Sequence, residues 1–265
     1  MFDIVMPLYN KEKYLKLAVE SVVLQDFVDW KLFIIDDCST DNSYDIAISL
    51  ASHDDRITVL RNEKNMGVGF TRKRGIGSGR NPWVMFLDAD DWWDPQMLKY
   101  VSEAIEENLD YVCTNYYFEP RHVIAADIPS GRIENFYEFF IKTRGRIPHT
   151  NAMAVRRDII TSIDAFPERM FSMEDNYTWM QVGRGAGRYI DTPLSAYRID
   201  VLDSITKQNK ALNFPSIVIK RSFDVPRRLR WSFFKVRIFI FLGYLYAEGR
   251  RLTRVAYKRR DPYGS

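Results

Sequence analysis

Four apolar residues run directly into three carboxylates at Val84-Met85-Phe86-Leu87-Asp88-Ala89-Asp90-Asp91. A short continuous apolar run is typical of a buried strand in a parallel sheet. The three aspartates would then lie at the C-terminal end of that strand, where open α/β sheets bind their ligands. Because like charges repel, the cluster predicts a compensating cation, and oxygen ligands favour Mg²⁺ or Mn²⁺. The alternative is an acidic turn before a helix that begins near Pro95, although Asp94 is already a suitable N-cap for it.

The rest of the chain has the composition of a folded protein. Its 265 residues are 46% hydrophobic and 28% charged, which suits one large domain or one domain with an appendage. Cys38 and Cys113 lack metal-ligand spacing, which favours a reducing compartment without disulfides. No basic leader precedes the first apolar stretch, and no uncharged apolar run reaches about 20 residues, so we expect neither a signal peptide nor an ordinary transmembrane helix.

The charge is unevenly distributed along the chain. Residues 221–260 hold 12 Lys and Arg against two acidic residues, a net +10, so the remainder of this +3 chain carries −7. The same segment is rich in aromatic residues, and it resembles a helix that lies at an anionic membrane interface. Packing on the rest of the chain or on a partner subunit is the main alternative. Nucleic-acid binding is the weakest one, since no recognisable reading motif is present.

Strand-like and helix-like segments alternate along the chain. Apolar runs typical of strands occupy 2–6, 32–35, 57–60, 83–87, 110–115, 121–126 and 152–155. Helical spacing of apolar residues falls at 15–22, 43–51 and 95–108 and again after Glu174. This alternation predicts right-handed βαβ units and a parallel sheet.

A glycine-rich segment introduces a basic cluster. Gly67-Val68-Gly69 precedes Arg72, which stands where the third glycine of a dinucleotide fingerprint would be, so a Rossmann NAD site is disfavoured. A helix packed on the sheet, with a basic residue aimed at phosphates, fits better. The alternative is a solvated basic helix face.

A second acidic pair, Glu174 and Asp175, begins an apolar-periodic helix. Acids are favoured in a first turn by the helix dipole, and the functional alternative is a general base that projects into a cleft beside the metal. His122 and His149 are isolated in the sequence, so we expect structural or surface roles for them, and His53 lies in a polar loop that gives no signal.

Taken together, these motifs resemble the family 2 glycosyltransferases of the GT-A fold over roughly residues 1–207. Asp88-Ala89-Asp90-Asp91 matches the family's DxD motif, and Glu174-Asp175 matches its acceptor-side ED motif. The other matching segments are Met6-Pro7-Leu8-Tyr9-Asn10, Ile35-Asp36-Asp37-Cys38-Ser39-Thr40-Asp41, Asn65-Met66-Gly67, Tyr197-Arg198 and Ser204-Ile205-Thr206.

The resemblance implies an α/β fold with a Rossmann-like, mostly parallel central sheet flanked by helices. The catalytic domain would span 1–210, with a nucleotide-sugar half at 1–92 and an acceptor half at 93–210. A helical, basic and aromatic arm would follow at 211–265. We expect a cytoplasmic protein, peripheral on the inner face of the cytoplasmic membrane, which would suit a lipid-linked acceptor.

The resemblance also implies the residues that contact the nucleotide. They are Pro7, Tyr9, Glu12, Asp37, Gly67, Arg72, Asp88 and Ala89. Asp37 would accept a hydrogen bond from the base, and Gly67 would let the backbone approach the nucleotide. One departure concerns Arg72, because many relatives carry Ala-Arg-Asn where this chain reads Phe70-Thr71-Arg72-Lys73.

The implied chemistry is sugar transfer with inversion. Asp90, with Asp91 and Asp88, would hold Mn²⁺ or Mg²⁺ on the diphosphate of a nucleotide-sugar, expected to be a UDP-sugar. Asp175, beside Glu174, would be the base that takes the proton from a glycan or lipid-linked acceptor hydroxyl. One base without an evident enzyme nucleophile predicts inversion. Two alternatives are a sugar-nucleotide-binding module without turnover and a nucleotidyltransferase, which would be expected to have a glycine-rich loop after its first strand; a homodimer is an open option.

Overall fold

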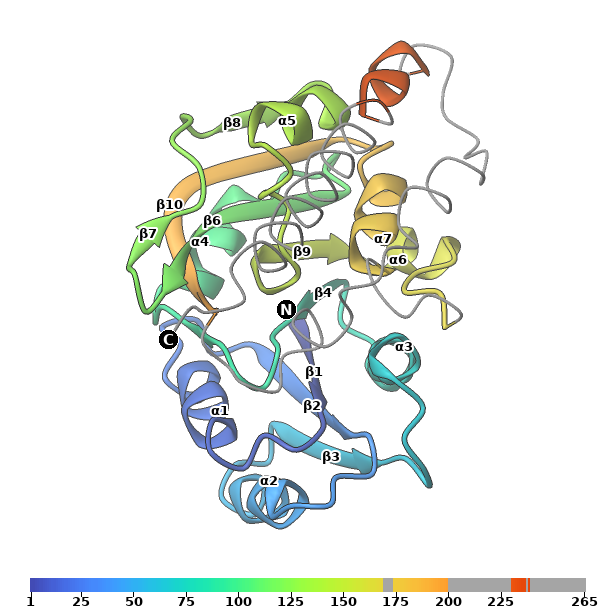
Figure 1. Cartoon of the computed structure of the whole chain (residues 1–265). Coiled ribbons are helices and arrows are strands. Elements are labelled where there is room, and N and C mark those ends of the chain that lie inside the picture. The colour runs from blue at the N-terminus through green and yellow to red at the C-terminus, as the bar shows by residue number, and fades with distance from the viewer. Residues whose placement is uncertain (169–173, 200–229, 237, 239–265) are drawn as a thin grey trace, which may run out of the picture.

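The computed structural model describes residues 1–168, 174–199, 230–236 and 238. They form a ten-stranded sheet with helices on both faces (Figure 1), in the order β3-β2-β1-β4-β9-β6-β10-β5, with β7 beside β6 and β8 beside β10. The strands are β1 Phe2–Leu8, β2 Trp30–Asp36, β3 Ile57–Arg61, β4 Trp83–Phe86, β5 Trp92–Trp93, β6 Tyr111–Glu119, β7 Val123–Ile124, β8 Gly131–Ile133, β9 Met153–Arg156 and β10 Gly187–Arg198. The helices are α1 Leu15–Val23, α2 Ser43–Ala51, α3 Val68–Ser78, α4 Met97–Ala104, α5 Phe136–Lys142, α6 Arg157–Ser162 and α7 Glu174–Val182, with a 3-10 turn, η1, at Thr150–Ala152.

The first four strands are parallel, as the alternation of strands and helices predicts. β1 pairs with β2 and β4, and β2 pairs with β3. Both faces of these strands are covered, which explains their nearly continuous apolar sequences. Because the C-terminal ends of parallel strands share one edge, the loops that follow β1, β2, β3 and β4 meet at that edge.

Each face of the sheet has its own hydrophobic core. Val5 and Phe86 face one core together with side chains from α3, α5, α6 and α7. Ile4 and Met85, one residue away on the same strands, face the other core with α1, α2 and α4. Close packing of α3 on β1 requires Gly75, because a Cβ there would lie 2.3 Å from Val5 Cγ1.

The second half of the sheet is mixed rather than parallel. β9 runs antiparallel between β4 and β6, whereas β6 and β10 are parallel. The strands β5, β8 and β10 and the helix α6 were not predicted. β10 escapes prediction because Asp191 and Pro193 interrupt its pattern, and register shifts against β6 accompany this interruption.

The predicted start of α4 at Pro95, with Asp94 as N-cap, is wrong. The helix begins at Met97 after Gln96. The backbone N–H of Asp94 instead donates to Leu194 O at 2.9 Å, and its carboxylate accepts from Gln96 N at 2.9 Å. Pairing of β5 with β10 holds the chain extended just before this point, so the helix starts later.

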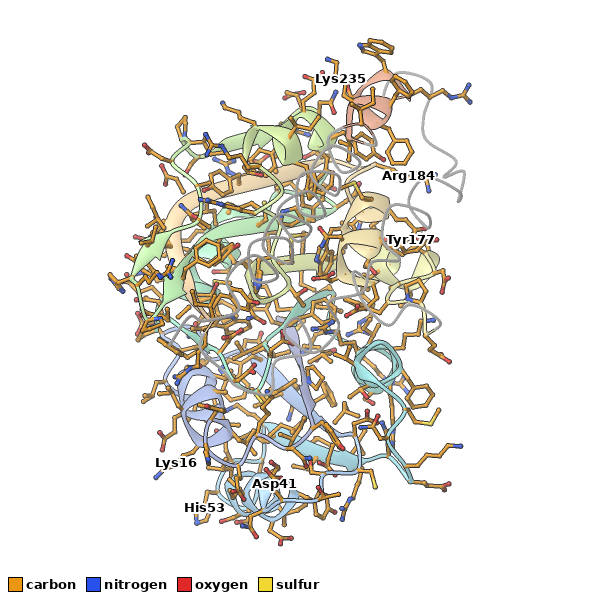
Figure 2. All side chains as sticks on the ribbon, in the orientation of Figure 1. Lys16, Asp41, His53, Tyr177, Arg184 and Lys235 are labelled. Carbon is orange, nitrogen blue, oxygen red and sulfur yellow. The ribbon has the colours of Figure 1, made fainter. Side chains whose placement is uncertain are left out.

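Most of the predicted C-terminal arm at 211–265, and its boundary near 210, lies outside the described residues. Residues 230–236 are helical, and Phe233 packs on Tyr137 of α5 with ring centroids 5.2 Å apart. Figure 2 shows Lys235 at the opposite end of the molecule from Asp41. Within the described residues, no helix combines the length and hydrophobicity needed to span a membrane.

Candidate functional site

Loops after β1 and β2 are joined by hydrogen bonds at the shared edge of the sheet. Asn10 N donates to Ser39 Oγ at 3.1 Å, and Glu12 Oε2 accepts from Asn42 N at 3.1 Å. These loops carry three of the predicted nucleotide contacts. Pro7 lies at the end of β1, Glu12 is half-buried in this network, and the Tyr9 ring is 44% exposed, so a planar base could stack on it.

Asp37, which follows β2, is only 3% exposed. One of its oxygens accepts from Asn62 Nδ2 at 2.7 Å and Met66 N at 2.8 Å, and the other accepts from Gly67 N at 2.8 Å. The carboxylate therefore holds the loop after β3 against the loop after β2. A carboxylate has about four lone-pair positions, so little acceptor capacity is left for a nucleotide base.

Gly67 is the turn from that loop into α3. Its φ of 86° lies in the left-handed region that glycine adopts without a steric penalty. A Cβ at this position would meet nothing within 4 Å, so backbone conformation rather than space explains the glycine. Gly67 directs α3 along the sheet. Arg72, in the second turn of this helix, thereby reaches Asp88 at the C-terminal edge of the parallel strands.

Arg72 joins the two acidic motifs. Its guanidinium donates to Asp88 Oδ1 at 2.8 Å and to Glu174 Oε1 at 2.9 Å. Burial opposes the charged form, but the charges of Asp88 and Glu174 outweigh it and raise the pKa of Arg72. At 5% exposure this residue is buried, so the solvated-face interpretation of the basic cluster is wrong for Arg72.

The aspartates after β4 have different environments. Asp90 Oδ2 forms an ion pair with Lys11 Nζ at 2.8 Å. Asp91 is buried, and it accepts from Arg198 N at 2.7 Å and from the side-chain amide of Asn151. Burial, together with the charges of Asp90 and Asp88, raises the pKa of Asp91. Ala89, between them, is buried in the core.

This arrangement fits a metal held mainly by substrate. In the part of the chain that the structure describes, no three His, Cys, Asp or Glu side chains converge to hold a metal ion. Asp88 and Asp90 nevertheless keep 28% and 18% of their side chains exposed. Mg²⁺ is commonly bound through one or two carboxylates plus substrate phosphates, which these two residues could provide. The predicted ligand Asp91 does not fit, because both of its oxygens already accept hydrogen bonds inside the protein.

The predicted acid pair begins α7. Asp175 Oδ2 accepts from Thr150 Oγ1 at 3.4 Å, and the side chain is half-buried. Burial and the neighbouring Asp175 charge raise the pKa of Glu174 to about 7. The buried Glu174 carboxylate contacts Arg72, whereas Asp175 keeps partial access to solvent.

These geometric features agree with the comparison against protein families. The model described as Glycosyl transferase family 2 matches residues 3–165, more than half of the chain. The chain belongs to this family.

Relatives of this family 2 chain come from several bacteria. EpsH of Bacillus subtilis is 28% identical over 221 residues, which cover 79% of this chain and 64% of EpsH. WfgD of Escherichia coli, named UDP-Glc:alpha-D-GlcNAc-diphosphoundecaprenol beta-1,3-glucosyltransferase, is 30% identical over 117 residues, which cover 44% of this chain and 46% of WfgD. The chain matches less than two thirds of the length of either relative.

Solved structures establish the fold of this family 2 chain. S. aureus TarS in complex with UDP-GlcNAc matches with a TM-score of 0.68 at 21% identity, covering 82% of this chain and 64% of that one. Mannosyltransferase PcManGT from Pyrobaculum calidifontis, in complex with GDP-Man and Mn²⁺, matches with a TM-score of 0.71 at 16% identity, covering 100% of this chain and 76% of that one. The predicted α/β class of the GT-A type is confirmed.

Sequence reasoning missed several residues that β9 and its preceding turn bring to the site. The His149 ring packs against the rings of Tyr116 and Tyr197, with centroids 4.7 and 4.5 Å away. Burial lowers the pKa of His149 more than Asp88 and Asp175 raise it, which favours the neutral imidazole. Asn151 accepts from Asp88 N at 2.9 Å while it donates to Asp91. No local pattern marks these residues, because their partners lie far along the chain.

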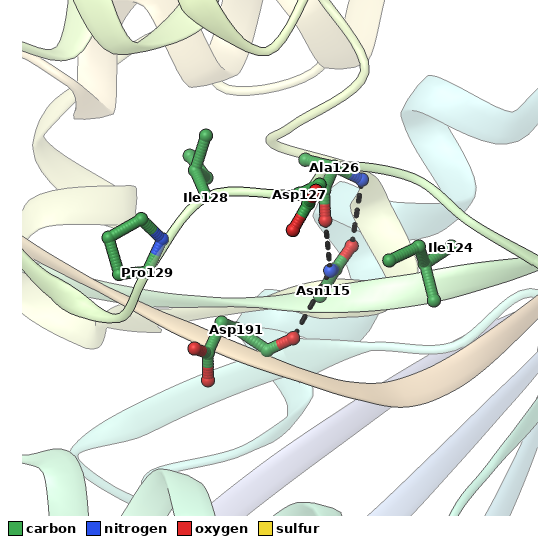
Figure 3. Close-up of a pocket in the computed structure, with 7 residues that line it drawn as sticks. All are labelled: Asn115, Ile124, Ala126, Asp127, Ile128, Pro129 and Asp191. Carbon is green, nitrogen blue, oxygen red and sulfur yellow. Dashed lines mark hydrogen bonds between the residues drawn. The ribbon is translucent and has the colours of Figure 1, made fainter.

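A cavity of about 350 Å³ lies apart from these carboxylates, between β6, β10 and the loop that follows β7 (Figure 3). Its polar floor is Asn115, which donates to Ala126 O at 2.7 Å and to Asp191 O at 3.1 Å. The amide is fully engaged in holding the loop onto the sheet, so we assign no ligand to this cavity.

Proposed function

We propose that this chain is an inverting, metal-dependent glycosyltransferase that moves a sugar from a nucleotide-sugar to an acceptor hydroxyl. The observation that carries the proposal is the Arg72 bridge. It joins Asp88, at the edge that the parallel strands create, to Glu174, next to the proposed base. A donor side and an acceptor side are thus connected within one cluster.

On the donor side, the loops after β1, β2 and β3 would bind the nucleotide. The exposed Tyr9 ring is suited to contact the base, and Asp37 holds the loops that surround it. Asp90, with Asp88, would hold Mn²⁺ or Mg²⁺ against the diphosphate. When bound, the metal would stabilise the negative charge that develops on the departing diphosphate.

On the acceptor side, Asp175 would take the proton from the attacking hydroxyl. Its Oδ2 is oriented by Thr150, and its access to solvent distinguishes it from the buried Glu174. Removal of that proton as the oxygen attacks is general-base catalysis. A single displacement with one base would invert the configuration at the anomeric carbon.

The relatives support a UDP-sugar donor and a lipid-linked or glycan acceptor. The name of WfgD specifies UDP-Glc and a diphosphoundecaprenol-linked acceptor, and TarS was solved with UDP-GlcNAc. PcManGT was solved with GDP-Man and Mn²⁺, which supports a divalent metal and makes GDP-sugars the necessary comparison.

The test is a turnover assay with a panel of UDP- and GDP-sugars, Mn²⁺ and lipid-linked or oligosaccharide acceptors. We expect nucleoside diphosphate release that depends on acceptor, and NMR of the product should show the anomeric configuration opposite to that of the donor. Binding of nucleotide-sugar without any product would favour the binding-module alternative. Release of inorganic pyrophosphate when a nucleoside triphosphate reacts with a sugar phosphate would favour a nucleotidyltransferase.

We further propose that residues 221–260 bring the protein to an anionic membrane surface. Helical residues 230–236 keep Phe233 and Val236 buried, whereas Trp231 is 67% exposed. The Trp231 ring stacks on the exposed Phe234 ring with centroids 5.6 Å apart. An exposed aromatic face within a strongly basic segment is suited to lie among anionic headgroups. Such contact would place the protein peripherally on the cytoplasmic membrane, close to a lipid-linked acceptor.

Sedimentation with phosphatidylglycerol-rich vesicles tests this contact. The Trp231→Ser/Phe234→Ser variant should lose most of its vesicle-bound fraction, while Leu17→Ser/Val28→Ser, which removes two apolar side chains exposed elsewhere, should bind as the unmodified chain does. Equal binding by both variants would contradict the membrane role of this face.

A further inference from the structure

Lys11 is held directly over one of the DxD carboxylates. Its Nζ forms an ion pair with Asp90 Oδ2 at 2.8 Å, and both side chains are more than four-fifths buried. The backbone of Lys11 is fixed as well, because its N–H donates to Ser43 Oγ at 2.7 Å. The adjacent Glu12 N donates to Asp41 Oδ2 at 3.2 Å. The loop that carries this ammonium is therefore built in place by the turn before α2.

The Lys11–Asp90 pair is the most exchangeable contact in the acidic cluster. Asp88 accepts from Arg72, which Glu174 also anchors, and Asp91 accepts from Asn151 and a backbone N–H. Asp90, by contrast, pairs with a single lysine side chain through one oxygen. A ligand that competes for Asp90 has only to move one side chain.

Displacement of Lys11 by a free divalent cation would be opposed by electrostatic repulsion. It would share Asp90 with a nearby ammonium that has no other described acidic partner, at a site where partial burial weakens screening by water and salt. A diphosphate changes the balance, because its oxygens are strong acceptors for an ammonium. With diphosphate present, Lys11 can leave Asp90 without losing an anionic partner.

We propose that Lys11, paired with Asp90, prevents a free divalent cation from binding there. When a nucleoside diphosphate group enters, Lys11 moves to the phosphate and leaves Asp90 free to bind the cation. This inference rests on the proposed metal role of Asp90. Metal and nucleotide then bind cooperatively, and each raises the affinity of the other by the same factor. Lys11 is a positioning residue in this account: its ammonium pairs with carboxylate in the free protein and with phosphate in the complex.

The experiment measures Mn²⁺ binding by the full chain from the loss of the aqueous Mn²⁺ EPR signal, with and without UDP. The variants are Lys11→Met, Lys11→Arg and, as the matched control, Lys13→Met, which removes an exposed lysine of the same loop. We expect Lys11→Met to bind Mn²⁺ alone about tenfold more tightly than the unmodified chain, with a smaller effect of UDP. Lys11→Arg and Lys13→Met should keep weak Mn²⁺ binding alone and the full UDP effect.

Mn²⁺ affinity of Lys11→Met equal to that of the unmodified chain, in the absence of UDP, would overturn the inference. Asp90→Asn distinguishes this failure from that of the proposed function. If Asp90→Asn abolishes UDP-dependent Mn²⁺ binding while Lys11→Met changes nothing, the metal role stands and only the lysine block is wrong. If Asp90→Asn binds Mn²⁺ as the unmodified chain does, both are wrong. Thermal unfolding verifies that each variant is folded, and Lys11→Gln replaces Lys11→Met if the latter does not fold.

Discussion

Asp37 and Asp90 lie at the same edge of the sheet, yet their surroundings are opposite. Asp37 accepts three N–H groups, two of them from the backbone, whereas Asp90 accepts from one lysine side chain. Backbone donors cannot move away without unfolding the loop, but a lysine can move to a new partner. Asp37 therefore mainly holds the loops of the site together, whereas Asp90 is available to a ligand.

Replacing Asp90 should separate function from stability most clearly. We expect Asp90→Ala to lower turnover about 10²- to 10³-fold, because the developing diphosphate charge loses its metal. The free energy of unfolding should change by only about 1 kcal/mol, since loss of the Lys11 ion pair is offset by relief of the repulsion between Asp90 and Asp91. Steady-state kinetics and denaturant unfolding of the same preparation measure both quantities. Turnover near that of the unmodified chain would remove Asp90 from the mechanism.

Asp175→Asn tests whether Asp175, like Asp90, affects turnover rather than stability. Turnover should fall on the order of 10²-fold, because the amide cannot accept the acceptor proton. Nucleotide binding should be unchanged, since no donor-side contact is altered. Calorimetric titration with UDP and Mn²⁺ provides the control, and an unaltered rate would assign the base elsewhere.

Asp37→Ala should mainly lower the stability of the protein, in contrast to Asp90→Ala, which should mainly lower turnover. Loss of this carboxylate leaves the buried Asn62 amide and the part-buried N–H groups of Met66 and Gly67 without their acceptor, at a cost of about 2 kcal/mol in unfolding free energy. Urea denaturation measures the change. A variant as stable as the unmodified chain would show that Asp37 does not hold these loops, and the contrast with Asp90 would disappear.

The last prediction concerns the pH dependence that Glu174 gives to stability. Its pKa is raised from 4.5 to about 7 in the folded chain, so the folded state binds a proton that the unfolded state has lost between these values. Glu174 therefore makes the unfolding free energy fall as the pH rises from about 4.5 to 7. In Glu174→Gln this fall should be smaller, as measured by urea denaturation at several pH values. An unchanged pH profile would contradict the assignment of Glu174 as a buried, readily protonated acid.

Much of the donor half could be predicted because its signals are local. The strand at Trp83–Phe86 and the aspartates after it are adjacent in the sequence, and the parallel arrangement of β1 to β4 then places their loops at one edge. The pairings within the site could not be predicted. Lys11 meets Asp90, and Arg72 meets Glu174, across long stretches of chain, and no periodicity encodes such contacts.

The acceptor half was predicted less well for related reasons. β10 contains Asp191 and Pro193 and shifts its register, so its sequence lacks the alternation of a regular strand. His149 is a single residue in a polar segment, and its contact with Tyr116 and Tyr197 depends on how β9 and β10 pack around β6. The role of the C-terminal segment stays a prediction, and the structure describes only residues 230–236 and 238 of it.

The most direct test of the central claim is thermal unfolding of the unmodified chain and Asp90→Ala with UDP, GDP, dTDP or CMP, each with and without Mn²⁺. A nucleotide at about 100 times its Kd should add roughly 2.7 kcal/mol to the unfolding free energy. We expect UDP to stabilise the unmodified chain most strongly with Mn²⁺, and we expect Asp90→Ala to lose the Mn²⁺-dependent part of this stabilisation. No stabilisation by any nucleotide, or an equal Mn²⁺-dependent shift in Asp90→Ala, would contradict a donor site built around this carboxylate.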